Sequence, residues 1–187
     1  MNSTTHIGVI IGSAREGRLG SSVAGWVGQE LDKRSDLTWS LIDPLEFDLP
    51  ASMAEESEAL CQHLRVADAF LVVVPEYNHS FPAVLKQLID YGYYEWQAKP
   101  VGFVSYGARS GGIRAVEQLR PVFSELHAIT VRDAVALPNV WDLFDANGAL
   151  IEPEGPTQAL GRVFAQLAWW ATASRLAGNE TPYSQVA

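Results

Sequence analysis

The segment Ala69-Phe70-Leu71-Val72-Val73-Val74 is one apolar run, and Pro75-Glu76-Tyr77-Asn78 follows it directly. An apolar run without polar alternation is typical of a strand that is covered on both faces, as in a parallel sheet. The polar and aromatic residues after the run would then lie beyond the carboxyl end of the strand. Because ligands of open parallel α/β sheets bind outside that edge, the segment predicts a buried strand that ends in a binding loop.

The remainder of the chain alternates further strand patterns with helix patterns. The other expected strands are short apolar segments at residues 6–11, 37–41, 101–105 and from 129 onward. The expected helices lie at about residues 21–33, from the acidic group Glu55, Glu56 and Glu58 onward, from Pro82 to about Tyr91, at about 113–126 and around 160–171. We expect Pro121 to kink the fourth of these helices, because it removes a hydrogen bond to Glu117, and Gly178 to end the last one.

This order of elements predicts one α/β domain over residues 1–187, without linkers, repeats or low-complexity segments. Right-handed crossovers then give a doubly wound five-stranded parallel sheet with helices on both faces. The loops after the first, third and fourth strands come together only if the strand order reverses beside the first strand. The flavodoxin-like order 2-1-3-4-5 meets this condition, and it places a flavin between strands one and three.

Charge and cysteine content limit the partners and the compartment. The formal net charge of −9 argues against binding to nucleic acid or to an anionic membrane, since both need a basic patch. Cys61 is the only cysteine, which excludes an internal disulfide. Together with the lack of a signal peptide and of an apolar run of transmembrane length, this predicts a cytoplasmic protein.

The segment from Gly12 to Ser22 is a second candidate binding loop. It lies between an expected strand and an expected helix, so it would present backbone N–H groups and the positive end of the helix dipole to an anion. Its side-chain donors are the hydroxyl and guanidinium groups of Ser13, Arg15, Arg18, Ser21 and Ser22. Guanidinium forks suit phosphate oxygens, so the segment predicts a site for a terminal phosphate. The alternative is an ordinary turn with surface arginines.

The sequence does not match three other well-known loop motifs. The loop has the glycine spacing of a Walker A motif, but Arg18 and Leu19 stand where lysine and a hydroxyl residue are required. The dinucleotide fingerprint G-x-G-x-x-G is absent. The nucleophile elbow G-x-S-x-G is absent as well, because two residues separate Gly107 from Ser110. The absence of a hydroxyl for magnesium argues against nucleoside triphosphate chemistry.

Three segments together resemble one family. They are Gly12-Ser13-x-Arg15-x-Gly17-Arg18-x-Gly20, Pro75-Glu76-Tyr77-Asn78-x-Ser80-x-Pro82-Ala83-x-Leu85-Lys86-x-x-Ile89-Asp90 and Ser105-Tyr106-Gly107-x-x-x-Gly111-Gly112. In order and spacing they resemble the NADPH-dependent FMN reductases of the flavodoxin-like superfamily, which include quinone, azo-dye and chromate reductases. The resemblance covers about residues 6–135. The chain departs from many members at Arg18 and Gly20, where serine and asparagine are frequent, and at His79, where glycine is frequent.

The resemblance implies a tightly bound FMN. Its phosphate would lie on the first segment, and its isoalloxazine ring would lie between the second and third segments. The implied cofactor-binding residues are Ser13, Arg15, Arg18, Gly20, Ser21, Pro75, Glu76, Tyr77, Asn78, Ser105, Tyr106, Gly107, Gly111 and Gly112. No side chain is assigned a catalytic role and no metal ligand is expected, because the N5 atom of the flavin carries the chemistry.

The implied activity is that of an NAD(P)H-dependent oxidoreductase. NADPH or NADH would reduce FMN by hydride transfer, and a quinone, free flavin or similar small acceptor would then be reduced in ping-pong turnover. The resemblance also implies a homodimer or homotetramer. The aromatic residues Tyr91, Tyr93, Tyr94 and Trp96 would lie either at its interface or in a satellite of the core.

Two other functions remain open at this point. One is a non-enzymatic electron carrier of the flavodoxin type, which the acidic charge fits but the paired arginines and the Pro75–Asn78 segment do not. The other is a reductase that supplies reduced FMN to a monooxygenase, and it differs in how readily FMN dissociates.

Overall fold

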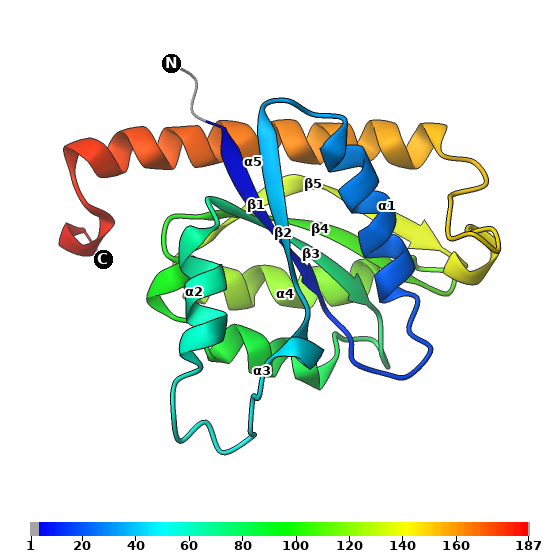
Figure 1. The fold of residues 1–187 in the computed structure, drawn as a ribbon, viewed down its shortest axis with the longest axis horizontal. Coiled ribbons are helices and arrows are strands. Elements are labelled where there is room, and N and C mark those ends of the chain that lie inside the picture. The colour runs from blue at the N-terminus through cyan, green and yellow to red at the C-terminus, as the bar shows by residue number, and fades with distance from the viewer. Residues whose placement is uncertain (1–3, 187) are drawn as a thin grey trace.

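The structure is a computed structural model that describes residues 4–186. Five parallel strands form one sheet in the order β2-β1-β3-β4-β5, which confirms the expected flavodoxin-like fold (Figure 1). The strands are β1 (Thr5–Ile11), β2 (Leu37–Ile42), β3 (Ala69–Pro75), β4 (Pro100–Gly107) and β5 (Ile129–Pro138).

Five α-helices cover the two faces of the sheet. They are α1 (Gly20–Asp32), α2 (Glu58–Val66), α3 (Ala83–Asp90), α4 (Ile113–Glu125) and α5 (Glu154–Glu180). Helices α1 and α5 pack on one face, whereas α2, α3 and α4 pack on the other (Figure 1). Short 3-10 helices η1 (Pro44–Glu46), η2 (Tyr94–Trp96), η3 (Val140–Asp142) and η4 (Tyr183–Gln185) lie between or after them.

Two hydrophobic cores result, one on each side of the sheet. Successive side chains of a strand point to opposite faces, so Val9 and Ile11 contribute to the core under α1 and α5 while Ile10 contributes to the core under α2, α3 and α4. Every residue of β3 is buried, as its unbroken apolar run predicts. Because β3 is the middle strand, the loop that follows it lies at the centre of the carboxyl edge.

Strand register then decides which loops meet. In β3, Val73 lies beside Ile11 of β1, and Pro75 lies beside Tyr106 of β4. Strands β1, β3 and β4 therefore end side by side, and the loops after them leave the sheet at one place. This is the switch in strand order that the sequence predicted.

Two expected helix boundaries were wrong. Glu55 and Glu56 precede helix α2, which begins at Glu58. Helix α5 continues past Gly178 to Glu180 and ends where Pro182 forces Thr181 into an extended conformation. Helix α4 runs through Pro121 to Glu125, and the kink stays a prediction. Although α5 has 27 residues, no helix within residues 4–186 combines the length and apolar character needed to cross a membrane.

The aromatic residues after α3 separate into two groups. Trp96 is fully buried against Phe70, and Tyr91 is buried as well. Tyr93 and Tyr94, by contrast, are 50% and 77% exposed. The first pair is core, so only the second pair remains available for an interface.

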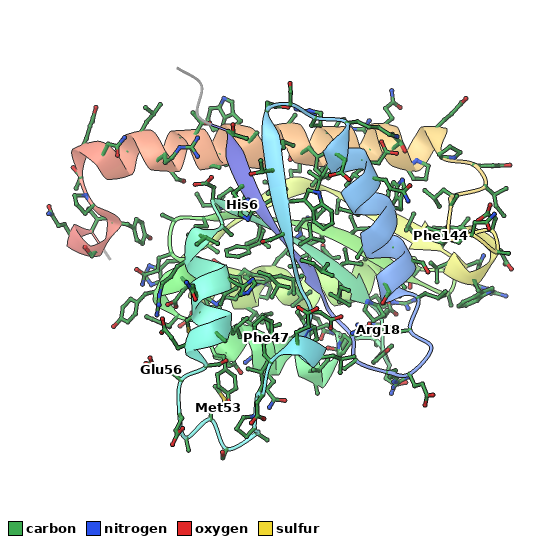
Figure 2. The ribbon with its side chains drawn as sticks, in the orientation of Figure 1. His6, Arg18, Phe47, Met53, Glu56 and Phe144 are labelled. Carbon is green, nitrogen blue, oxygen red and sulfur yellow. The ribbon has the colours of Figure 1, made fainter. Side chains whose placement is uncertain are left out.

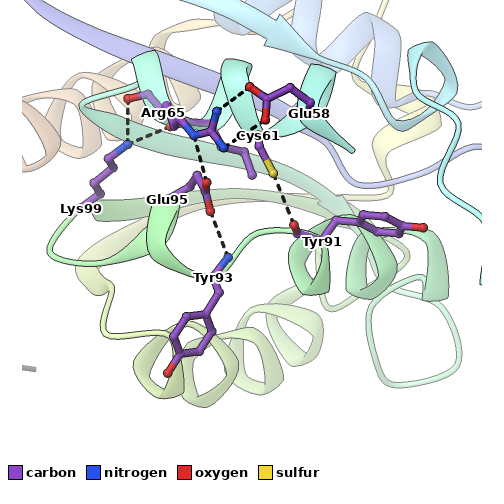
Figure 3. Close-up of polar contacts among 8 residues, drawn as sticks. Glu58, Cys61, Arg65, Tyr91, Tyr93, Glu95 and Lys99 are labelled. Atoms are coloured by element: carbon purple, nitrogen blue, oxygen red, sulfur yellow. Dashed lines mark hydrogen bonds and ion pairs between the residues drawn. The ribbon is translucent and has the colours of Figure 1, made fainter. Parts of the chain in front are cut away.

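Cys61 packs beneath this aromatic segment. Its Sγ lies 3.6 Å from the carbonyl oxygen of Tyr91, while Arg65 nearby pairs with Glu58 and Glu95 (Figure 3). Burial raises the pKa of the Cys61 thiol. A buried, protonated thiol is a small apolar residue rather than a nucleophile.

Candidate functional site at the carboxyl edge of the sheet

Three loops converge at the carboxyl edge of the sheet, at residues 12–22, 75–80 and 106–112. The Gly12 N–H donates to the carbonyl oxygen of Val73 at 2.8 Å, which joins the first loop to β3. The Glu76 N–H donates to the carbonyl oxygen of Tyr106 at 3.1 Å, which joins the second loop to β4. The structure thus brings together the three segments that sequence analysis singled out.

The first loop carries many backbone donors without an acceptor. Within residues 12–22, the N–H groups of Gly12 and Arg18 bond to other backbone atoms, whereas those of residues 13–17 and 19–22 have no acceptor in the described part of the chain. Those of residues 20–22 belong to the first turn of α1, where no side chain caps the helix. Loop and helix end together present a positively polarised surface to an anion.

Ser13 joins the first loop to the third beneath this surface. Its side chain is buried, and its Oγ lies 3.2 Å from the hydroxyl oxygen of Tyr106. Gly20 passes directly above this contact. A Cβ atom at Gly20 would lie 2.8 Å from the Tyr106 hydroxyl oxygen and 2.9 Å from Ser13 Oγ. A larger residue would therefore separate the two loops, which explains glycine here.

The two arginines of the loop have different environments. Arg15 is exposed, and its guanidinium carbon lies 3.8 Å from the ring centroid of Tyr77 in the second loop. Arg18 is turned away from solvent, with 11% of its side chain exposed, and it pairs with Asp43 after β2. Figure 2 shows Arg18 beside the start of α1. The sequence predicts the same phosphate role for both arginines, whereas the structure gives them different partners.

Asp43 is a residue of this site that sequence analysis missed. A usable signal was present, because a polar residue directly after a parallel strand lies at the carboxyl edge.

The second loop is a tight two-residue turn. Tyr77 and Ser80 exchange backbone hydrogen bonds of 2.9 and 3.0 Å, and Asn78 and His79 between them have φ values of 50° and 73°. Positive φ at both central positions defines a type I′ turn. Gln118 of α4 donates from Nε2 to the His79 carbonyl oxygen at 2.7 Å. The turn is therefore held from two sides, while the His79 side chain is exposed.

Glu76 joins the second loop to the third through its side chain. Its carboxylate accepts hydrogen bonds from Ser110 Oγ at 2.7 Å and from Arg114 Nη1 at 2.6 Å. Burial acts to raise the pKa of Glu76, but the bonds from Ser110 and Arg114 outweigh it and hold this pKa below its ordinary value. Glu76 is thus an ionised structural link and no proton donor at neutral pH.

The third loop is built around two glycines with positive φ. Gly111 has φ 59° and Gly112 has φ 83°. The buried Ser105 donates from Oγ to the Gly111 carbonyl oxygen at 2.8 Å, so this side chain shapes the loop from below. The Gly112 N–H has no acceptor within residues 4–186.

A separate groove lies at the other edge of the sheet. It has a volume of about 850 Å³ and is lined in part by Thr5, Arg34 and Trp169. Thr5 begins β1 and Arg34 precedes β2, so this groove lies at the amino ends of the strands. It is not part of the candidate site.

We expect the buried Tyr106 to make the fold less stable at alkaline pH. Burial raises its pKa to about 12, against a partly compensating hydrogen bond with Ser13. Between about pH 10 and pH 12, the unfolded phenol ionises while the folded phenol stays protonated, so the free energy of unfolding falls as pH rises. We expect the parent to lose about 1 kcal/mol more than Tyr106→Phe between about pH 8 and pH 11.

Urea unfolding at both pH values measures this difference. The control is Tyr94→Phe, which removes a hydroxyl from a side chain that is 77% exposed and should follow the parent. Parallel curves for the parent and Tyr106→Phe would contradict the expectation.

Comparisons with known proteins agree with this geometry. The family model described as NADPH-dependent FMN reductase matches residues 5–142. An NAD(P)H-dependent FMN reductase of Schizosaccharomyces pombe is 34% identical over 152 residues, which cover 72% of this chain and 74% of that protein. A quinone reductase of Pseudomonas putida is 29% identical over 168 residues, which cover 83% of this chain and 90% of that protein.

The fold has solved counterparts as well. The flavoenzyme FerB of Paracoccus denitrificans, an NAD(P)H:(acceptor) oxidoreductase, superposes with a TM-score of 0.75 at 18% identity, covering 91% of this chain and 99% of that one. At this identity the likeness bears on the fold alone. The family match covers the candidate site as well as the fold, because residues 5–142 contain all three converging loops. The chain therefore belongs to the NADPH-dependent FMN reductase family.

Proposed function

We propose that the loops at residues 12–22, 75–80 and 106–112 hold one FMN molecule at the carboxyl edge of the sheet. The observation that carries this proposal is the row of backbone N–H groups in the first loop that have no acceptor in the described part of the chain. A phosphate dianion supplies the acceptors that such donors need, at the positive end of α1. The donor set therefore fits the phosphate of FMN.

Side chains around the first loop add to this donor set. Arg15 is exposed beside the loop and bears a full positive charge, and Ser21 carries a hydroxyl at the start of α1. In this proposal both bind the phosphate directly. Arg18 and Ser105 act differently: Arg18 is paired with the carboxylate of Asp43, Ser105 donates to the Gly111 carbonyl oxygen, and each shapes a loop.

The second and third loops offer backbone groups to the flavin ring. The N–H groups of Asn78 and Gly112 have no acceptor among the described residues. Fixed N–H donors stabilise negative charge that develops on a bound group, without a proton transfer from a side chain. This fits a site in which no side chain is an acid or base, and the bonded, ionised Glu76 agrees with it.

The chain is an enzyme, an FMN-dependent NAD(P)H oxidoreductase. When bound, FMN would supply the redox chemistry, which is two-electron transfer from NAD(P)H to a small acceptor. We propose a quinone as acceptor, which the similarity to the Pseudomonas putida quinone reductase supports. In this proposal the residues of this chain bind the flavin and orient it.

Rapid-mixing absorbance measurements test the proposed turnover. The purified protein, loaded with FMN and kept without oxygen, is mixed with NADPH and then with a quinone. We expect the flavin absorbance to be bleached by NADPH and restored by the quinone. A bound flavin that NADPH does not bleach would end the proposal, and one that the quinone does not restore would end the assignment of the acceptor.

The proposal also covers the oligomeric state and the cellular location. We propose a homodimer or homotetramer, because Tyr93 and Tyr94 leave apolar area exposed beside α3. Light scattering on the purified protein gives its mass, and a monomer would contradict this.

The proposed location is the cytoplasm, which agrees with a single buried cysteine. We also propose that residues 1–187 form one domain, since α5 packs on the same sheet as α1.

A further inference from the structure

We infer that Asp43 is a positioning residue for the phosphate half of the flavin site. It holds Arg18, and through Arg18 it keeps the loop at residues 13–21 in the conformation that presents its N–H groups. The inference rests on the proposed function, because it concerns how tightly the loop binds the phosphate of FMN.

Arg18 ties both ends of the loop to one carboxylate. Its Nη1 donates to the carbonyl oxygen of Ser13, at the start of the loop, and to Asp43 Oδ1 at 2.9 Å. Its Nη2 donates to Asp43 Oδ2. Its Nε lies 3.3 Å from Ser21 Oγ, at the other end of the loop. One guanidinium group therefore spans the loop, and its charge is already paired.

Asp43 is itself held by the backbone around it. It follows β2, whose last residue Ile42 lies in register with Ile10 of β1. Its Oδ1 also accepts a hydrogen bond from the Leu45 N–H at 3.0 Å, which caps η1. The residue is 8% exposed. Arg18 cannot turn toward a ligand without leaving a buried carboxylate unpaired, which is strongly unfavourable.

Charge and positioning make opposite predictions for Asp43. By charge alone, a carboxylate near an anion site repels the phosphate, and neutralising it should tighten FMN binding. By positioning, loss of the carboxylate releases Arg18 and lets the loop sample other conformations. Binding must then restrict the loop again, which weakens affinity. We expect the loss of positioning to outweigh the loss of charge repulsion. The loop contributes a row of backbone donors, whereas Asp43 is a single charge that is already paired.

Flavin fluorescence titrations decide between these predictions. Dissociation constants are measured for FMN and for riboflavin, which lacks the phosphate, on the parent and on Asp43→Asn. We expect Asp43→Asn to bind FMN at least about tenfold more weakly, comparable to the loss of one charge-assisted hydrogen bond, and riboflavin within about twofold of the parent. A merely structural role would change both constants alike. Unchanged or tighter FMN binding by Asp43→Asn would overturn the inference.

Two further variants keep the result interpretable. Arg18→Met combined with Asp43→Leu replaces the ion pair by apolar side chains, which buried pairs tolerate. This double variant should melt as the parent does and still lose FMN affinity selectively over riboflavin, and parent-like affinity would refute the inference. Asp36→Asn is the matched control, since Asp36 pairs with Arg34 at the opposite edge and its side chain is 55% exposed. If the parent itself bound no FMN, that result would contradict the proposed function, whereas a loss-free Asp43→Asn contradicts only the inference about Asp43.

Discussion

Arg15→Ala is expected to bind FMN about 30- to 900-fold more weakly than the parent. Two contributions are lost. The first is a charge-assisted bond to the phosphate, which contributes about 1.5–3 kcal/mol. The second is the contact with Tyr77, where the guanidinium carbon lies 3.8 Å from the ring centroid. A cation–π contact at an exposed position contributes about 0.5–1 kcal/mol, and here it joins the first loop to the second.

Comparison of two flavins separates these contributions. Riboflavin has no phosphate, so its affinity should fall only by the share that the Tyr77 contact contributes. Arg132→Ala is a matched control, because it removes the same charge from a side chain that is 93% exposed. The measurement is a fluorescence titration of each variant with each flavin. If Arg15→Ala retained FMN as tightly as Arg132→Ala, the assignment of the phosphate to this loop would be wrong.

Gly112→Ala is expected to lower the free energy of unfolding by about 3 kcal/mol or more. Two causes act together. Gly112 has φ 83°, a left-handed conformation that costs an alanine about 1–2 kcal/mol. A Cβ atom there would also lie 2.7 Å from the Tyr106 nitrogen and 2.8 Å from Ser105 Cβ. Neither neighbour is the end of a flexible side chain, so the end of β4 must shift.

The consequence for the site follows from the position of that strand end. Tyr106 contacts Ser13 through its hydroxyl, so a shift of β4 disturbs the first loop as well as the third. Urea unfolding measures the stability, and FMN titration below the transition measures the site. Gly161→Ala is the matched control in α5, where an added Cβ meets nothing within 4 Å and should stabilise the helix by about 0.5–1 kcal/mol. Equal stability of Gly112→Ala and the parent would contradict the argument.

Sequence alone was sufficient to predict the strands and α-helices, their order and the three loops that meet at the carboxyl edge of the sheet. Hydrophobic periodicity acts between neighbouring residues, so the buried run of β3 and the alternation of strands and helices can be recognised without knowledge of the fold. Proline and glycine act locally too, although Gly178 did not end α5 and Pro182 did. The family was recognisable because its three motifs are short and keep their spacing. The rival function of a non-enzymatic carrier is set aside by that family match.

Only the tertiary structure decided which side chains are partners. Arg18 pairs with Asp43, 25 positions away, and Ser13 contacts Tyr106, 93 positions away. Such contacts depend on strand register and on side-chain rotamers, which are fixed when strands β2, β1, β3 and β4 pack side by side. Arg15 and Arg18 are therefore indistinguishable in the sequence of the loop. In the fold, Arg15 faces solvent beside Tyr77, whereas Arg18 is held by the buried carboxylate of Asp43.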